Sequence, residues 1–352
     1  MRAFHVAVIA LATVAVSSSL SGCYLLKQGA GQAQLLLSRT PVEKVVAQPE
    51  TTQEAKDKLA LINEAKVYAE QTIGLRETRN YQEFVKLDRD AVSYVVSAAP
   101  PDKLEAYTWW FPIIGAVPYK GYFDRAEAVA LQDELKGQGY DTILRGVPAF
   151  STLGWLPDPV YSPFLKYDRP TLANIIIHEL THVTLYLSGQ ASFNEGFATF
   201  VGNVGAQDFL KGKYGADSAE YQAARDAVAD NAVFTEFVQA VSAKLDALYQ
   251  SDRPKEQKLA EREAVFAWAK ETFKAEYEPR MKSHQFRHFP SGVFNNASLI
   301  SYRTYYNRLD RFEAAHRKLG GDLRQTVAYF RDTVAKAPDP EKYLDAYLAD
   351  KL

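Results

Sequence analysis

The chain has 352 residues, with 41 Lys and Arg against 43 Asp and Glu, so its formal net charge is only −2. A near-neutral chain offers no strongly basic surface, and we therefore expect no nucleic-acid partner. The sequence also lacks a Walker loop, a dinucleotide-binding glycine motif and a G-x-S-x-G element, which excludes the nucleotide and serine-hydrolase sites that depend on them. Its single cysteine excludes an internal disulfide.

The N-terminus has the features of a bacterial lipoprotein signal. Arg2 precedes an apolar stretch, residues 6–16, that is too short for a typical membrane span. Leu20-Ser21-Gly22-Cys23 follows and resembles a lipobox, whose cysteine is lipidated and becomes N-terminal after cleavage. A weak secretory signal with an incidental cysteine is the alternative. We predict a signal peptide over residues 1–22 and lipidation of Cys23. Because no Asp follows the cysteine, the resemblance implies the outer membrane of a bacterial envelope, facing the periplasm.

Residues 23–50 are interpreted as a lipidated tether, and residues 51–352 as one folded domain. A helix is expected over residues 52–88, after which short β-branched and aromatic segments broken by prolines indicate strands. The expected strands are 92–96, a segment within 107–117, 119–123 and 142–147, with a helix over 124–136 before the last. We therefore predict a small mixed sheet within residues 89–170, approximately.

The most informative segment is Ile177-His178-Glu179-Leu180-Thr181-His182. Its two histidines are four residues apart, so on a helix both imidazoles project from one face. Imidazoles at this spacing can chelate one Zn²⁺, and Glu179 can act as general base toward a metal-bound water. The apolar flanks indicate a buried helix, with Asp168 as N-cap, Pro170 in the first turn and Gly189 at its end. Hydrogen-bonded core histidines with a salt-bridged glutamate are the alternative.

Glu195 is predicted to be the third metal ligand, which leaves a fourth position for water and substrate. Ser192-Phe193-Asn194-Glu195 also matches a capping box, in which the glutamate would cap a helix and need no metal. Three histidines farther along the chain are the other candidates for the third ligand: His284, His288 and His316. After Glu195 the chain is expected to be almost wholly helical, over residues 193–210, 217–249, 255–282, 293–318, 322–335 and 339–350.

The expected order of elements resembles that of the zincin metallopeptidases: a sheet comes first, then a metal-binding helix, then a helical part. The expected fold class is therefore α+β and predominantly helical, with active-site helices at about 171–210 and a helical part at about 211–352. Further segments look like the bacterial predicted aminopeptidase family, which is known chiefly as lipid-anchored or secreted HExxH proteins. They occur in the family's order and cover most of the mature chain: residues 95–100, 110–115, 118–123, 139–141, 150–155, 158–159, 295–297 and 320–322.

The site and the resemblance together predict a zinc metallopeptidase, and the family name implies an aminopeptidase that acts on peptides. In this hypothesis His178, His182 and Glu195 hold one Zn²⁺, and Glu179 activates the attacking water. An oxyanion donor is also expected. By resemblance and residue type its candidates are Tyr305, which we place first, Tyr302 and His288.

An aminopeptidase must recognise a free α-amino group, usually with an additional carboxylate near the metal. Asp158 and Asp124 are the candidates for that carboxylate, although a turn-forming role fits Asp158 better. Three other functions stay open at this point: a zinc endopeptidase, a non-peptide amide hydrolase of the envelope, and a catalytically silent metal-binding lipoprotein.

Overall fold

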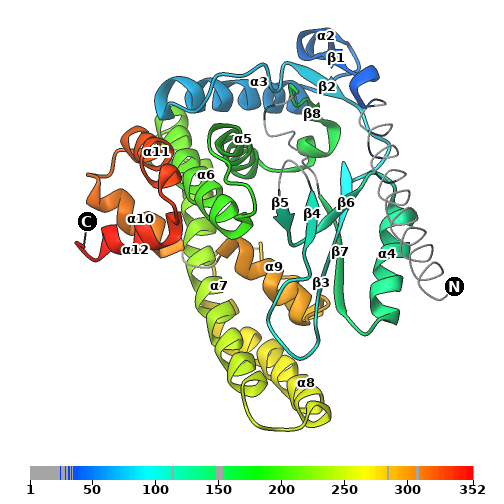
Figure 1. The fold of residues 1–352 in the computed structure, drawn as a ribbon. Helices are drawn as coiled ribbons and strands as arrows, with labels where there is room; N and C mark the ends of the chain where they lie inside the picture. Colours follow the sequence, from blue (N-terminus) through cyan, green and yellow to red (C-terminus); the bar gives the residue numbers. More distant parts are fainter. Residues whose placement is uncertain are drawn as a thin grey trace, which may run out of the picture.

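The computed structural model describes residues 24, 28, 31, 33, 35–111, 115–147, 154, 156–283, 285–306 and 309–351. Over these residues the chain is α+β and mostly helical (Figure 1). The predicted signal peptide and Cys23 lie outside them. None of the described helices is both long and apolar enough to cross a membrane.

The main sheet is antiparallel and three-stranded, in the order β6 (Lys120–Tyr122), β3 (Ser93–Ala99) and β7 (Asp141–Val147). Helix α4 (Arg125–Gly137) packs on one face of this sheet and α9 (Asn296–Tyr306) on the other (Figure 1). Because both faces are covered, the central strand β3 is buried along almost its whole length. These strands confirm the predictions made at 92–96, 119–123 and 142–147.

Two smaller sheets complete the strand content of the described residues. One has the order β1 (Thr40–Pro41), β2 (Glu83–Val85) and β8 (Val160–Tyr161), with one antiparallel and one parallel pair. The other is the hairpin of β4 (Trp109–Phe111) and β5 (Gly115–Val117). The prediction of a single mixed sheet is therefore wrong in detail, since the mixed pairing belongs to the small β1–β2–β8 sheet.

The remaining chain packs as helices around a central pair. That pair is α5 (Arg169–Thr184) and α6 (Ala191–Tyr214), which make the most extensive contact of any two elements. The other helices of the described residues are α2 (Val42–Ala47), α3 (Gln53–Tyr68), α7 (Ala219–Tyr249), α8 (Lys255–Thr272), α10 (Leu309–Lys318), α11 (Leu323–Asp332) and α12 (Pro340–Leu348).

Two predicted boundaries differ from the structure for identifiable reasons. The helix expected to reach residue 88 continues from α3 as a short π-helix, Ala69–Ile73, and stops at Gly74. Gly74 adopts the left-handed conformation (φ 80°) that commonly ends helices. The expected tether also packs in part on the domain, because Leu35 is buried with residues of the β1–β2–β8 region.

Asn296, at the start of α9, links this helix to the rest of the fold. Its side chain is fully buried (0% exposed) and donates to the carbonyls of Pro100 (2.9 Å) and Lys103 (3.2 Å). Its amide oxygen accepts from the Tyr249 hydroxyl at 2.9 Å. Its backbone N–H donates to Asp141 (3.0 Å) at the start of β7. These contacts set the position of α9 against β3 and β7.

We expect Asn296→Leu to lower the free energy of unfolding by about 3 kcal/mol, because two carbonyls and a hydroxyl would stay buried without their partner. Urea denaturation followed by circular dichroism measures this loss. Gln257→Leu on the exposed surface of α8 is the matched control and should change stability by less than about 0.5 kcal/mol. A loss below about 1 kcal/mol for Asn296→Leu would show that α9 is held by other contacts.

Candidate metal centre

Helix α5 carries the two histidines and is buried in the centre of the molecule. Asp168 caps it by accepting a hydrogen bond from the backbone N–H of Thr171 (2.9 Å), and Pro170 lies in its first turn, as predicted. The β-branched run at 175–177 is helical nevertheless, since Ile176 and Ile177 are completely buried in the main core. The helix ends at Thr184 with an extended Leu185, so the prediction of Gly189 as its end is wrong. Gly189 instead lies at positive φ in the connection to α6.

Helix α6 approaches α5 closely enough to bring Glu195 to the two histidines. A Cβ atom added at Gly202 would lie 3.2 Å from the Asn174 carbonyl oxygen and 3.3 Å from the His178 Cβ. Even one added methyl group would therefore be crowded here, and glycine allows the close approach of the two helices. Asn194 further fixes the turn between them through two 2.8 Å hydrogen bonds with the backbone of Leu187.

His178, His182 and Glu195 form a group that could hold a metal ion. The two Nε2 atoms lie 3.1 Å apart, and the Glu195 Oε2 lies 3.4 Å from one and 3.5 Å from the other. A tetrahedral zinc ion with ligand distances of about 2.0–2.2 Å separates its ligand atoms by roughly 3.3–3.6 Å. The three donor atoms therefore have a spacing close to that of three corners of such a site.

The charges of this group also favour a cation. Burial alone would lower the pKa of His182, but the neighbouring Glu195 outweighs burial and raises it. Burial would likewise raise the pKa of Glu195, but His182 and His178 hold it well below its usual range. At 3.1 Å the two Nε2 atoms either share an N–H···N hydrogen bond, in which one imidazole donates to the other, or direct both lone pairs to one metal ion.

The capping-box alternative for Glu195 is not what the structure shows. Helix α6 begins at Ala191 with Gln190 as its N-cap, so Ser192 lies inside the helix and makes no cap hydrogen bond. Glu195 instead directs its carboxylate to the two histidines, and its side chain is only 12% exposed. The sequence pattern S-x-x-E is present, but it does not act as a cap.

Tyr305 lies at the end of α9, and its hydroxyl is within the electrostatic influence of Glu195. Burial raises the pKa of its hydroxyl, the charge of Glu195 raises it further, and Arg145 opposes both. The hydroxyl therefore stays protonated near neutral pH and can donate a hydrogen bond. The charge of Glu179 also raises this pKa, to a smaller extent.

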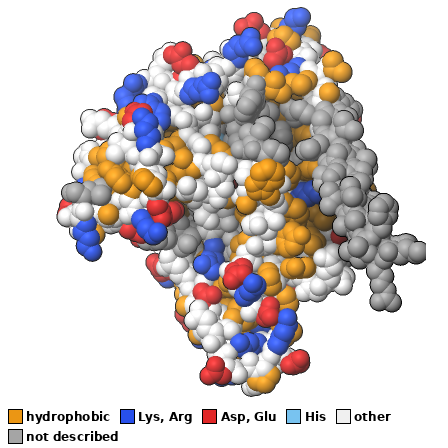
Figure 2. Space-filling view, in the orientation of Figure 1, with side chains coloured by type: hydrophobic (Ala, Val, Ile, Leu, Met, Phe, Trp, Pro, Cys, Tyr) orange, Lys and Arg blue, Asp and Glu red, His pale blue; other side chains and the backbone are white. Residues whose placement is uncertain are grey.

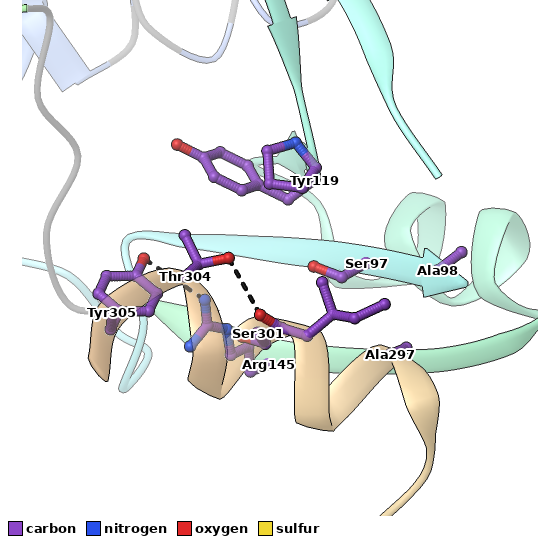
Figure 3. A pocket seen from close by; sticks show the side chains of 10 residues that line it. Ser97, Ala98, Tyr119, Arg145, Ala297, Ser301, Thr304 and Tyr305 are labelled. Carbon is purple, nitrogen blue, oxygen red and sulfur yellow. Dashed lines mark hydrogen bonds between the residues drawn. The ribbon is translucent and has the colours of Figure 1, made fainter. Parts of the chain in front are cut away.

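Two side chains near this centre were not predicted from the sequence: Tyr119 and Arg145. Burial and the charge of Glu195 raise the pKa of Tyr119 well above its ordinary value. Arg145, on β7, donates from Nη2 to the Tyr305 hydroxyl at 3.5 Å. Figure 3 shows the three side chains around a small pocket between the main sheet and α9, with the hydroxyls of Tyr119 and Tyr305 toward the same end. The sequence signal for Arg145 is a charged residue that follows Ile143 and Leu144 in a strand.

The other candidates lie elsewhere. Tyr302 packs edge-on against Phe234 in a second aromatic core, and His288 is exposed beside Arg287. His316 shares a hydrogen bond with Thr326 (2.8 Å) and does not join the metal-binding group. His284 lies outside the described residues.

Neither candidate for the amino-binding carboxylate joins the metal-binding group. Asp124 caps α4 by accepting from the Ala126 N–H at 2.7 Å. Asp158 is buried, and its N–H donates to the Asn80 side chain at 3.0 Å. Its carbonyl accepts from the N–H of Tyr81 (2.7 Å), a residue at φ 64°, in the left-handed region that a bulky side chain seldom adopts. Asp158 thus holds the loop at Tyr81.

Comparison with known proteins gives one match. The family model described as "Putative aminopeptidase" matches residues 23–343, a range that includes the HELTH segment, Glu195 and Tyr305. No curated protein and no solved structure matches the chain. Since the family match covers nearly all of the sequence after the predicted signal peptide, the chain belongs to this putative aminopeptidase family.

Proposed function

We propose that this protein is a zinc metallopeptidase that releases N-terminal residues from peptides. The observation that carries the proposal is the spacing of His178 Nε2, His182 Nε2 and Glu195 Oε2, which fits three ligands of one tetrahedral ion. Two imidazoles and one carboxylate with an open fourth position are the ligand set of hydrolytic zinc sites. Membership in the aminopeptidase family supports the choice of peptides as substrates.

The chain's own side chains supply the proton transfers of this reaction. A bound Zn²⁺ would polarise the substrate carbonyl and lower the pKa of the attacking water. Glu179 accepts the proton of that water and then delivers it to the nitrogen of the leaving amine. The neutral hydroxyl of Tyr305 donates a hydrogen bond to the carbonyl oxygen as negative charge develops on it.

A mixed peptide library tests the proposed function. The soluble form that starts at Tyr24 is incubated with the library, and the products are identified by mass spectrometry, with Glu179→Gln as the control. Stepwise loss of N-terminal residues in the wild type alone would establish an aminopeptidase. Internal cuts would make the protein an endopeptidase. No cuts at full zinc occupancy would overturn the peptidase proposal in favour of a non-peptide amide substrate or a silent site.

We expect Tyr305→Phe to lower kcat about a hundredfold, because one donor to the developing oxyanion is lost. Steady-state kinetics on an aminoacyl reporter measures the effect, and metal analysis should show unchanged zinc content. Tyr302→Phe is the matched control on the same helix, since Tyr302 faces the aromatic core, and its kcat should stay within about twofold of the wild type. Equal effects of the two substitutions would remove Tyr305 from the mechanism.

We also propose that Cys23 is lipidated and holds the enzyme at the outer membrane, facing the periplasm. Tyr24, the next residue, packs on the main sheet: its hydroxyl donates to the Gly121 carbonyl (2.8 Å), and its ring lies 5.3 Å from that of Tyr122. An anchor at Cys23 would therefore leave the domain beside β6. Apolar side chains gather on the neighbouring surface over β4 and β5 (Figure 2), where Trp110 is 71% exposed.

Cys23→Ala is expected to abolish fatty-acid incorporation and to move the protein from the membrane fraction to the soluble fraction. Metabolic labelling with a radioactive fatty acid and fractionation of cells measure both effects. Labelling that persists in Cys23→Ala would show that the lipid is attached elsewhere or that the association is not covalent.

A further inference from the structure

Arg145 carries a guanidinium that has almost no partners among the residues that the structure describes. Its Nη2 makes a long hydrogen bond of 3.5 Å to the Tyr305 hydroxyl, its guanidinium carbon lies 5.3 Å from the centre of that ring, and its Nε is buried without a hydrogen bond. Every Asp and Glu of the chain lies in the described residues. None of their carboxylate oxygens is within 4.0 Å of a guanidinium nitrogen of Arg145, the distance that defines an ion pair. Arg145 is half-buried, and an arginine in this state has donors left for a ligand.

Two other arginines of low exposure, Arg262 and Arg311, have acidic partners, whereas Arg39 resembles Arg145 in having buried guanidinium nitrogens without a hydrogen bond. Arg262 pairs with Asp141 through two hydrogen bonds of 2.8 and 3.0 Å. Arg311 contacts both Glu341 and Asp345. Holding a charge away from water without a partner is costly, and Arg145, unlike Arg39, lines a cavity in which a ligand could supply that partner.

The surroundings of Arg145 form a narrow cavity, and the charge of Glu195 acts on three of the side chains that line it: Arg145, Tyr119 and Tyr305. Side chains from β3, α9 and the connection between β5 and β6 line it (Figure 3): Ser97, Ser301, Thr304, Tyr305 and Tyr119. The cavity measures about 10 Å³, close to the space for one water-sized group, so an oxygen atom fits where a whole side chain does not. The Thr304 hydroxyl donates to the Ile300 carbonyl of its own helix (3.0 Å), so its proton is not directed into the cavity. Arg145 is the charged donor among the residues that line the cavity.

The charge balance next to the cavity favours an anionic ligand. Glu195 and Glu179 together would offset the two charges of a bound zinc ion, which leaves the positive charge of Arg145 uncompensated. Burial opposes that charge, but Tyr305 and Glu195 raise the pKa of Arg145 above its ordinary value, so it stays protonated. A guanidinium binds carboxylates through charge-assisted hydrogen bonds, which makes a carboxylate the matching group of a peptide.

We propose that Arg145 binds a carboxylate of the substrate, so that the enzyme prefers peptides with a carboxylate close to the scissile bond. This inference rests on the proposed peptidase function. Two sources have the same chemistry, the C-terminal carboxylate of a dipeptide and the side chain of an acidic residue after the cleaved bond. In both cases the carboxylate belongs to the residue directly after the scissile bond. Consecutive Cα atoms are about 3.8 Å apart, so this residue is the immediate neighbour of the one whose carbonyl is attacked.

Two pairs of substrates separate these sources. The first pair is Ala-Ala and Ala-Ala-amide, which differ in the C-terminal carboxylate. The second pair is Ala-Glu-amide and Ala-Gln-amide, which differ in the side-chain carboxylate. For the wild type we expect kcat/KM to be about 10- to 100-fold higher for the acid of at least one pair, as expected for one charge-assisted contact. The pair that shows the preference identifies the source.

Arg145→Met keeps the length of the side chain and removes its charge, and Arg145→Lys keeps the charge and removes the planar fork. We expect the acid-to-amide ratio to fall to about one in Arg145→Met and to an intermediate value in Arg145→Lys. The ratio is the readout because a general loss of activity lowers kcat/KM equally for both substrates of a pair. A displaced Tyr305 would cause such a general loss. A wild type without preference, or an unchanged ratio in Arg145→Met, would overturn the proposal.

A binding measurement separates this proposal from the proposed function. N-acetylalanine and N-acetylalaninamide are titrated by calorimetry into zinc-loaded full-length protein, in the wild type and in Arg145→Met. Tighter binding of the acid that is lost in Arg145→Met, together with no cleavage of any peptide, would keep the carboxylate site and overturn the peptidase function. Cleavage of peptides with no preference for the acid in either assay would keep the peptidase function and overturn the carboxylate site.

Discussion

Glu179→Gln is expected to lower kcat by about two to four orders of magnitude, while the proposed zinc ion is retained. The substitution keeps the size of the side chain but removes the carboxylate that accepts the proton of the attacking water, and general-base catalysis of this kind contributes about 10²–10⁴-fold. Metal content should not change, because the proposed ligand atoms belong to His178, His182 and Glu195. A loss of catalysis at constant occupancy therefore isolates the role of Glu179.

Single-turnover kinetics on a dipeptide reporter, with metal content measured on the same sample, checks this expectation. The matched control is Glu77→Gln, an exposed glutamate for which we expect unchanged kcat and zinc content. Activity within tenfold of the wild type in Glu179→Gln would assign the proton transfer to another group. Loss of zinc in that variant would instead make Glu179 part of the metal site.

The metal-binding group could be predicted from the sequence because its geometry is mostly local. His178 and His182 are one helical turn apart, and the cap at Asp168 and the buried flanks show where the helix starts and that it lies inside the core. Glu195 follows on the next helix, after a connection of six residues. The capping-box alternative could not be excluded from spacing alone, since only the packing of α6 on α5 shows which way the carboxylate points.

Arg145 and Tyr119 could not be predicted, because tertiary structure brings them to the site. Arg145 lies on β7, and it meets α9 only because that helix packs across β3 and β7. Tyr302 and Tyr305 are nearly one turn apart on α9, and the core packing of the helix decides which one faces the metal-binding group. The left-handed backbone of Tyr81 is likewise a property of the loop that Asp158 holds.

Glu195→Ala is expected to weaken zinc binding by a hundred- to a thousandfold. Four-ligand zinc sites in small domains bind with about 10–16 kcal/mol, so one ligand contributes roughly 3–4 kcal/mol. The substitution also removes the only negative charge in the metal-binding group and leaves the two Nε2 atoms, 3.1 Å apart, without their acidic partner. Both effects act against metal binding, and competition with a chromogenic chelator measures the change in affinity.

Thermal unfolding supplies an independent readout of the same substitution. A ligand that binds only the folded state at a thousand times its Kd stabilises it by about 4 kcal/mol, so zinc should raise the Tm of the wild type by several degrees. A thousandfold loss of affinity removes almost all of that stabilisation, and the Tm of Glu195→Ala should hardly respond to zinc at the same concentration. Glu236→Ala, at an exposed position of α7, should keep the full response.

Full zinc occupancy of Glu195→Ala at limiting metal would place the third ligand elsewhere. Among the described histidines, neither the exposed His288 nor His316, which is bonded to Thr326, is in a position to replace it.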